Sequence, residues 1–153
     1  MIRVANKDDL EAVYRLMRQL SDHDFTREQF AACYRHNLKG NCIVVYEEDG
    51  DVYGCGVLSI HYPMHFSRKN AEIVNLIVEA NVRNRGIGKM ILNELERIAT
   101  ENECARIEVA SNKRRTDAHR FYIREGFADT HIKMTKEIHR CSKRFIIFQR
   151  LKC

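Results

Sequence analysis

The residues whose types and spacing best suit a chemical task lie at positions 75–92, Asn-Leu-Ile-Val-Glu-Ala-Asn-Val-Arg-Asn-Arg-Gly-Ile-Gly-Lys-Met-Ile-Leu. An apolar run leads into a short loop, and two glycines then open a stretch with the apolar periodicity of a helix. The first N–H groups of a helix are unpaired and partly positive, and glycine lets an anion approach the backbone closely. Arg83, Arg85 and Lys89 add formal positive charge. The segment therefore predicts a site for a diphosphate or a similar anion.

A second segment of interest covers residues 111–127, Ser-Asn-Lys-Arg-Arg-Thr-Asp-Ala-His-Arg-Phe-Tyr-Ile-Arg-Glu-Gly-Phe. Tyr122 is the residue in it that could do chemistry, because a phenol has a pKa of about 10 and is protonated at neutral pH. Such a group can donate its proton to a leaving thiolate. Packing beside Phe121 is the alternative interpretation of Tyr122.

The loop at 83–88, Arg-Asn-Arg-Gly-Ile-Gly, matches neither the GxxxxGK(S/T) nor the GxGxxG phosphate loop. It resembles the (Gln/Arg)-x-x-Gly-x-(Gly/Ala) signature of the GNAT superfamily of N-acetyltransferases. Ala118-x-x-Phe-Tyr, followed by Gly-Phe, resembles that family's second coenzyme motif. The resemblance spans roughly residues 2–138 and is best over 71–127. It implies acetyl-CoA as co-substrate, with the pyrophosphate held by the backbone amides of the loop.

The resemblance assigns two groups of residues to the coenzyme. The loop and the start of its helix supply Arg83, Asn84, Arg85, Gly86, Ile87, Gly88 and Lys89. The other contacts are assigned to Ile77, Val78, Asn112, Arg115, Phe121 and Tyr122. The main chain of Ile77 and Val78 is expected to pair with the pantetheine arm, and Asn112 to reach its amides. Lys113, Arg114 and Arg115 are expected either to meet the 3′-phosphate or adenine end or to be solvated.

The resemblance also implies a direct reaction, in which an amine attacks the thioester without a covalent intermediate and without a metal. The Val78 N–H would polarise the carbonyl, and Tyr122 would protonate the thiolate of coenzyme A. A protonated amine must first lose its proton, and Glu72 is the candidate base. A position two residues later that is often acidic in the family is Val74 here, and a surface acid is the alternative reading of Glu72.

The acceptor is expected to be a primary amine on a small molecule, such as a polyamine, an amino acid or an amino sugar, or on a protein. A non-catalytic acyl-CoA-binding sensor is the alternative function, because it would need residues 83–88 but not Tyr122. His61 and His65 do not predict a metal site, since Pro63 breaks a helical spacing between them and no third ligand is evident.

These residues must be positioned by elements that the pattern of the chain predicts. Strands are expected at residues 2–5, 42–47, 52–62, 71–79 and 105–110, and again near 127–134 and 144–151. Helices are expected after Asn6, after a Thr26–Gln29 capping box, from 86 to about 100, and from about 116 to 125 before Gly126. The predicted fold class is α/β (α+β), a mixed, mostly antiparallel sheet of about six or seven strands flanked by about four helices. The strands at 71–79 and 105–110 form its parallel pair.

Size and composition favour one domain over residues 1–153, in a chain of 153 residues without a linker. No apolar run approaches the roughly 20 residues of a membrane span, and the N-terminus lacks an apolar signal core, so a cytoplasmic protein without a membrane partner is expected. The six cysteines include no CxxC pair, which favours reduced, mostly buried thiols.

The net charge of +5 arises from the C-terminal segment, because residues 133–153 alone carry +6. A near-neutral remainder argues against a nucleic-acid-binding surface, although a nucleic-acid accessory protein that uses the basic C-terminus is a third reading. Residues 127–134 and 144–151 could close the sheet as a hairpin. Alternatively, residues 139–153 form an added strand or tail that pairs two copies as a homodimer.

Overall fold

The structure, a computed structural model, describes residues 1–138. Its strands are β1 (Ile2–Val4), β2 (Cys42–Glu48), β3 (Asp51–His61), β4 (Asn70–Val78) and β5 (Arg106–Val109). The α-helices are α1 (Leu10–Leu20), α2 (Arg27–Gly40), α3 (Ile87–Glu101) and α4 (Thr116–Arg124). Two short 3-10 turns, η1 (Lys7–Asp9) and η2 (Ala80–Val82), precede α1 and α3. Within this part of the chain, no helix is long and apolar enough to cross a membrane.

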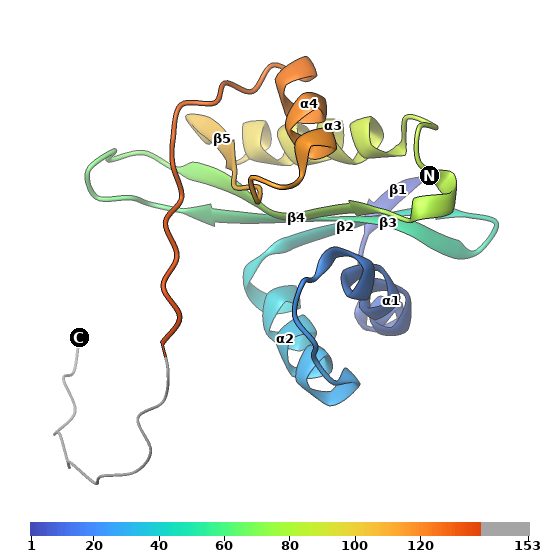
Figure 1. Ribbon diagram of the computed structural model, residues 1–153. Helices are drawn as coiled ribbons and strands as arrows, with labels where there is room; N and C mark the ends of the chain where they lie inside the picture. Colours follow the sequence, from blue (N-terminus) through green and yellow to red (C-terminus); the bar gives the residue numbers. More distant parts are fainter. Residues whose placement is uncertain (139–153) are drawn as a thin grey trace, which may run out of the picture.

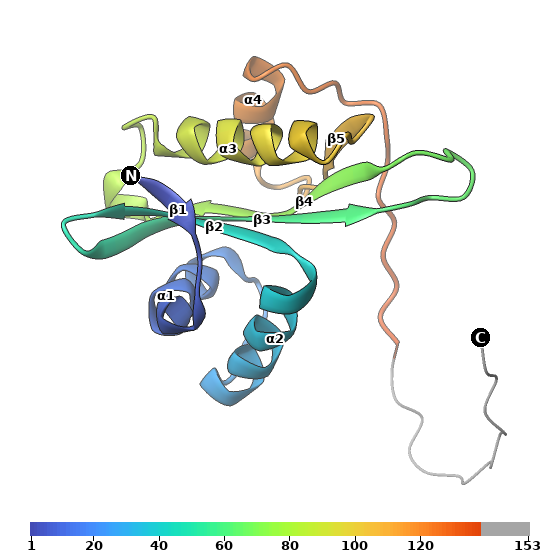
Figure 2. The ribbon, with the colours of Figure 1, turned by 180° about the vertical axis from the view of Figure 1, so that it is seen from behind.

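The strands form a single sheet in the order β1-β2-β3-β4-β5. All neighbours are antiparallel except β4 and β5, which are parallel. Helices α1 and α2 cover one face of this sheet, and α3 and α4 cover the other (Figures 1 and 2). The predicted mixed α/β class, the parallel pair and the four helices are therefore confirmed.

The predicted strand count of six or seven is too high for the described residues, which contain five strands. Residues 127–134 form no strand, and the expected strand at 144–151 lies outside the described residues. A strand requires a ladder partner, and among the described strands the edge strand β5 pairs only with β4. Ile132 and Met134 accordingly remain exposed to solvent.

Local sequence signals account for how the helices of the N-terminal half begin. Thr26 and Gln29 form the predicted capping box, in which Gln29 N donates to Thr26 Oγ1 over 3.2 Å and Gln29 Oε1 accepts from Thr26 N over 2.9 Å. Asn6 also caps as predicted, but it caps the 3-10 turn η1, and α1 begins only at Leu10.

The two faces of the sheet carry two hydrophobic clusters. One packs beneath α3 and α4, with Leu58, Ile73, Ile91 and Leu95 among its members. The other packs beneath α1 and α2, with Val13, Leu16, Val45, Cys55 and Ile77 among its members.

Two glycines of β3 bring α3 close to the sheet. A Cβ atom at Gly54 would lie 2.7 Å from Ile91 Cδ1, and one at Gly56 would lie 2.6 Å from Ile91 Cγ2. Real Cβ atoms do not approach that closely, so α3 rests directly on the β3 backbone. This close packing fixes where the N-terminus of α3 lies relative to the end of β4.

Candidate active site

The site is built around a split between the parallel strands β4 and β5. They pair only from Asn70 with Arg106 to Ile73 with Val109, after which β5 ends and β4 continues to Val78. The bulge at Val74, which the β3–β4 register skips, lies at the start of the split. Beyond it, no described strand pairs with the outer edge of β4. A free strand edge presents N–H and C=O groups with which an extended ligand can pair.

The direction of the Val78 N–H follows from the backbone hydrogen bond made by the next residue, Glu79. Glu79 N donates to Tyr53 O of β3 over 2.8 Å. Successive backbone N–H groups of a strand point to opposite sides, so the Val78 N–H points toward the free edge of β4. This direction suits the predicted contact of Val78 with the pantetheine arm and with the thioester carbonyl.

The loop that follows β4 has the backbone geometry of an anion cradle. Asn84 and Gly86 have positive φ angles of 64° and 79°. Gly86 is the N-cap of α3, and no side chain in the described part of the chain caps this helix. The first N–H groups of α3 are thus left for a ligand, with the positive end of the helix dipole behind them.

The three cations predicted for this loop all have partners in the structure. Arg83 Nε donates to the carbonyl oxygen of Val78 over 3.1 Å. Arg85 donates to the two carboxylate oxygens of Glu48 over 2.8 and 2.9 Å. Lys89 Nζ lies 3.1 Å from Glu125 Oε2. The latter two ion pairs are partly exposed and therefore weak, so both side chains can turn to a diphosphate at small cost.

Gly88 is the point at which the loop, β4 and α4 meet. A Cβ atom built at Gly88 would lie 3.7 Å from both Val78 Cγ2 and Phe121 Cε2. The two predicted coenzyme motifs, at 83–88 and at 111–127, are therefore in contact in the folded chain. Phe121 is partly buried against the core and packs edge-on against Tyr122 with ring centroids 5.2 Å apart.

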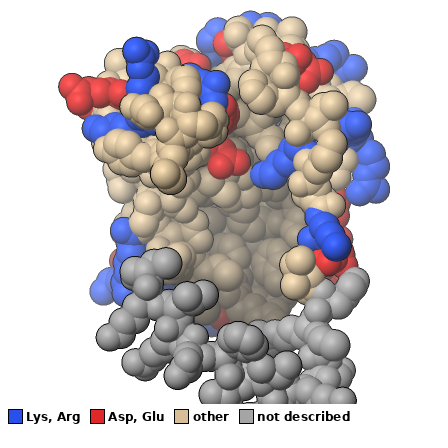
Figure 3. Space-filling model, turned by 90° about the vertical axis from the view of Figure 1, so that its left-hand side faces the viewer, with Lys and Arg blue, Asp and Glu red and all other residues tan. Residues whose placement is uncertain are grey.

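A cavity of about 580 Å³ opens beside the split. Its walls come from the end of α1, the α1–α2 connection, the first half of α2, the middle of β4, the end of β5 with the loop after it, and α4. Its lining residues are Met17, Leu20, Ser21, Asp22, His23, Phe25, Gln29, Phe30, Cys33, Ile73, Val74, Asn75, Leu76, Val109, Ala110, Ser111, Asn112, Arg115, Ala118 and Tyr122. Of the predicted site residues, Asn112, Arg115 and Tyr122 line it, whereas residues 83–89 lie outside it. The side of the molecule drawn in Figure 3 is hollowed, with charged side chains mainly on the surrounding ridges.

Tyr122 is almost fully buried, at 9% exposure, and lines this cavity. Its ring packs edge-on against Phe121, and also against Phe127, whose ring centroid lies 5.4 Å from that of Tyr122. Burial raises the pKa of Tyr122 to about 12, and the positive charge of Arg115 opposes part of that rise. The phenol is therefore fully protonated at neutral pH and available as a proton donor.

Glu72 lies on β4 but does not line the cavity. Its Oε1 is 3.7 Å from Lys133 Nζ, and its side chain is 37% exposed. The structure thus gives no contact between Glu72 and the space beside Tyr122, and its role as a base stays a prediction.

The sequence interpretation missed the residues that the α1–α2 connection adds to the cavity, among them Asp22, His23 and Phe25. No motif marks this connection, and its place depends on how α1 and α2 pack on the sheet. The four cysteines within residues 1–138 are free, and Cys55 is buried as expected. Cys33 differs from the expectation, because it is exposed and lines the cavity.

Comparison with known proteins assigns the class of this site. The model of the acetyltransferase (GNAT) family matches residues 10–127. An aminoalkylphosphonate N-acetyltransferase of Salmonella typhimurium is 30% identical over 140 residues, which cover 90% of each chain. The glucosamine-6-phosphate N-acetyltransferase structure from Arabidopsis thaliana has a TM-score of 0.76 and 20% identity, covering 91% of this chain and 98% of that chain. An aminoglycoside N-acetyltransferase solved with CoA has a TM-score of 0.76 and 21% identity, covering 92% of this chain and 100% of that chain.

The fold and the family match define an acyltransferase that uses acetyl-CoA. The chain belongs to the GNAT family of acetyltransferases.

Proposed function

We propose that the protein transfers the acetyl group of acetyl-CoA to the primary amine of a small molecule. The observation that carries this proposal is the position of Tyr122, a buried and protonated phenol in the wall of the cavity beside the β4–β5 split. The cavity gives an acceptor access to that phenol. The Salmonella relative acts on aminoalkylphosphonates by its name, which makes these compounds the first acceptors to test.

The residues around the split suit the proposed donor. The uncapped N-terminus of α3 and the positive φ at Gly86 supply backbone N–H groups for the pyrophosphate. The free edge of β4 supplies the Val78 N–H as a main-chain partner for the pantetheine arm. The same alternation turns the main-chain groups of Ile77 toward β3, so the contact predicted for Ile77 stays a prediction. Asn112 lies across the split, where its side chain accepts from Arg114 N over 3.0 Å in a turn that fixes the loop after β5.

The proposed reaction needs one bond to form and one to break. The neutral amine attacks the thioester carbon, the C–N bond forms, and the C–S bond breaks. The Val78 N–H stabilises the developing charge on the carbonyl oxygen, and Tyr122 donates its proton to the departing thiolate. Solvent returns a proton to Tyr122, and the proton lost by the amine leaves through a base. Glu72 is kept as the candidate for that base.

Two measurements test the proposal. Isothermal titration with acetyl-CoA is expected to give saturable binding, and release of free CoA thiol is then followed with a panel of small amines that includes aminoalkylphosphonates. We expect an amine-dependent release well above the rate of acetyl-CoA hydrolysis. Tight binding without release for any amine would instead identify a non-catalytic acyl-CoA sensor. An absence of binding would remove both functions.

Glu72→Gln tests the base with the same assay. If Glu72 accepts the amine proton, the variant loses about 10²–10⁴-fold in kcat at neutral pH and recovers as the pH approaches the pKa of the amine. An unchanged rate–pH profile would rule out Glu72 as the base.

A further inference from the structure

The cavity contains one permanently cationic side chain, Arg115, and the described part of the chain gives it no counter-ion. No other Lys or Arg among residues 1–138 lines the cavity. None of the ion pairs formed by the described residues includes Arg115. A half-buried guanidinium that faces a largely apolar cavity is costly unless an anion pairs with it.

Arg115 is held in place rather than free to turn into solvent. One of its terminal nitrogens donates to the carbonyl oxygen of Leu20, the last residue of α1. A guanidinium has five N–H donors in a fixed fork, so this single bond leaves most of them available to the cavity. Arg115 is also the N-cap of α4, whose first turn is not capped by a side chain and adds partial positive charge at the same point.

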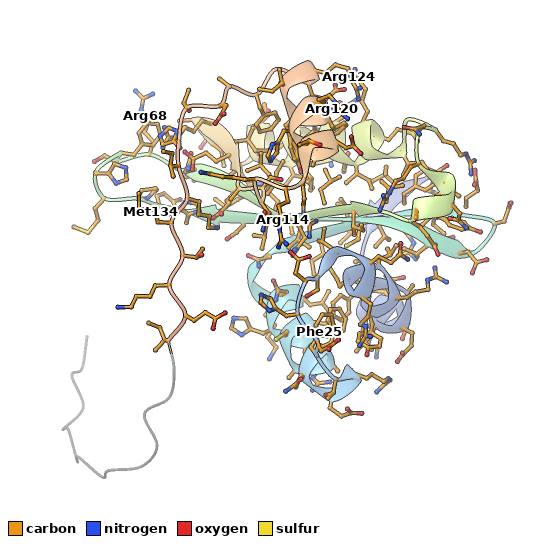
Figure 4. All side chains as sticks on the ribbon, viewed as in Figure 1. Phe25, Arg68, Arg114, Arg120, Arg124 and Met134 are labelled. Carbon is orange, nitrogen blue, oxygen red and sulfur yellow. The ribbon has the colours of Figure 1, made fainter. Side chains whose placement is uncertain are left out.

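The surrounding charges do not cancel this positive field. Asp22 is the one carboxylate among the lining residues, and its Oδ2 lies 3.6 Å from a terminal nitrogen of Arg114. Arg114 lies between α4 and the layer of α1 and α2 that carries Phe25 (Figure 4). Asp22 is therefore paired with a cation that does not itself line the cavity.

Arg115 lies apart from the anion cradle at residues 83–88. Arg115 and Tyr122 share the cavity, whereas residues 83–88 do not line it. Arg115 precedes Tyr122 by about two helical turns, so both side chains reach the cavity from the same face of α4.

Resting on the function proposed above, we infer that the acceptor is a compact amine that also carries an anionic group, and that Arg115 binds this group. A phosphonate, phosphate or carboxylate fits the fork of the guanidinium, which can pair with two of its oxygens. The amine at the other end of the molecule then points toward Tyr122. Arg115 would thus set which amines are accepted, without taking part in the bond changes.

The test compares acceptors that differ in charge. Wild type, Arg115→Gln and Arg120→Gln are assayed with 2-aminoethylphosphonate and with ethanolamine, which lacks the anion. Gln at 115 keeps an N–H donor for the Leu20 carbonyl but loses the charge. We expect Arg115→Gln to raise KM for 2-aminoethylphosphonate about 10–100-fold while changing KM for ethanolamine less than about threefold. Arg120→Gln is the matched control, because Arg120 lies on the same helix, is exposed and does not line the cavity. It should change neither KM by more than about threefold.

The coenzyme is the competing source of an anion at Arg115. If Arg115→Gln weakens binding of acetyl-CoA but not of acetyl-dephospho-CoA, the partner of Arg115 is the 3′-phosphate and the inference is wrong. Equal losses for the charged and the neutral acceptor would overturn it as well.

A binding measurement separates this inference from the failure of the proposed function. Methylphosphonate is titrated into the CoA complex of wild type and of Arg115→Gln. Binding to wild type that the variant loses supports the anion site even if no amine is acetylated. Equal binding, or none to wild type, contradicts it.

Discussion

Tyr122 is the residue on which the proposed chemistry depends. Tyr122→Phe keeps the ring that packs against Phe121 and Phe127 and removes only the proton donor. We expect kcat to fall about 10²–10⁴-fold with little change in the binding of acetyl-CoA. Steady-state CoA release together with titration of acetyl-CoA checks this expectation. Equal rates for the two proteins would remove Tyr122 as the acid.

The pH dependence of the wild-type enzyme follows from the same residue. The pKa of Tyr122 is raised to about 12, so its proton is lost only as the pH rises through that value. The rate should therefore not decline between pH 7 and about 10, and it should increase as the acceptor amine loses its proton. A fall in kcat near pH 8–9 that disappears in Tyr122→Phe would mean that the phenol titrates far below its expected range.

Among the residues of the site, those that belong to motifs could be predicted from the sequence. Those that only the tertiary fold brings to the cavity were missed. Asn112, Arg115 and Tyr122 belong to a recognisable motif that runs from the end of a strand into a helix, and all three line the cavity. Asp22 and His23 come from the distant α1–α2 connection, which has no pattern of its own. The ion pairs of Arg85 and Lys89 likewise join residues far apart in the sequence, and spacing alone does not indicate them.

The packing of α3 on β3 positions the anion cradle at the level of whole elements. Gly54→Ala would place its Cβ 2.7 Å from Ile91 Cδ1, and we expect a loss of about 1–3 kcal/mol in the free energy of unfolding. Ile91→Val removes that Cδ1 atom at a cost of about 0.5–1.5 kcal/mol. The double variant should lose less free energy of unfolding than the sum of the losses of the two single variants. Urea unfolding of all four proteins measures this difference.

Gly56→Ala with Ile91→Val is the control for this prediction. The contact at Gly56 is with Ile91 Cγ2, which valine retains, and with Leu95 Cδ1 at 3.0 Å. The losses of Gly56→Ala and Ile91→Val are therefore expected to add in this double variant. Strict additivity in the Gly54 double variant would show that the close approach of α3 is not what excludes a side chain at position 54.

Element prediction succeeded where periodicity and end signals agreed and failed where a partner was needed. The capping box at Thr26 and the glycines at 86 and 126 mark helix ends through local backbone chemistry. Gly126 has the positive φ of 93° that such a helix end requires. Residues 127–134 carry no comparable local signal, because pairing with another strand is a tertiary property that the segment itself does not encode.

At the scale of the whole molecule, the site joins the two halves of the chain, so the anchoring of the N-terminal half matters. Arg3 on β1 donates to both carboxylate oxygens of Asp9 over 2.8 and 2.7 Å, and its Nε donates to Glu47 of β2 over 2.5 Å. Asp9 Oδ2 also accepts from Asn6 N over 2.8 Å. This network ties the start of α1 to the edge of the sheet.

Asp9→Asn tests how far this network stabilises the fold. Hydrogen bonds from Arg3 hold the pKa of the buried Asp9 carboxyl below its ordinary value. The stability it contributes is therefore present above the unfolded pKa of about 3.9 and is lost as the pH falls through the lower folded value. We expect Asp9→Asn to lower the free energy of unfolding by about 2 kcal/mol at pH 7. As the pH is lowered further, the free energy of unfolding of the variant should fall less than that of wild type.

Asp8→Asn is the matched control, because Asp8 is exposed and enters none of the described ion pairs. It should change the free energy of unfolding by less than about 0.5 kcal/mol. Parallel acid profiles for wild type and Asp9→Asn would contradict the role given to Asp9.

The anion cradle, the β4–β5 split and Tyr122 all have roles in one proposed reaction, the direct transfer of the acetyl group to an amine. It is tested most directly by mixing the acetyl-CoA complex with 2-aminoethylphosphonate and following products and protein by mass spectrometry through a single turnover. We expect N-acetylated amine and free CoA to form in one phase, with no acetylated protein at any time. Acetyl groups on the protein that precede the product, or CoA that is released without N-acetylated amine, would contradict it.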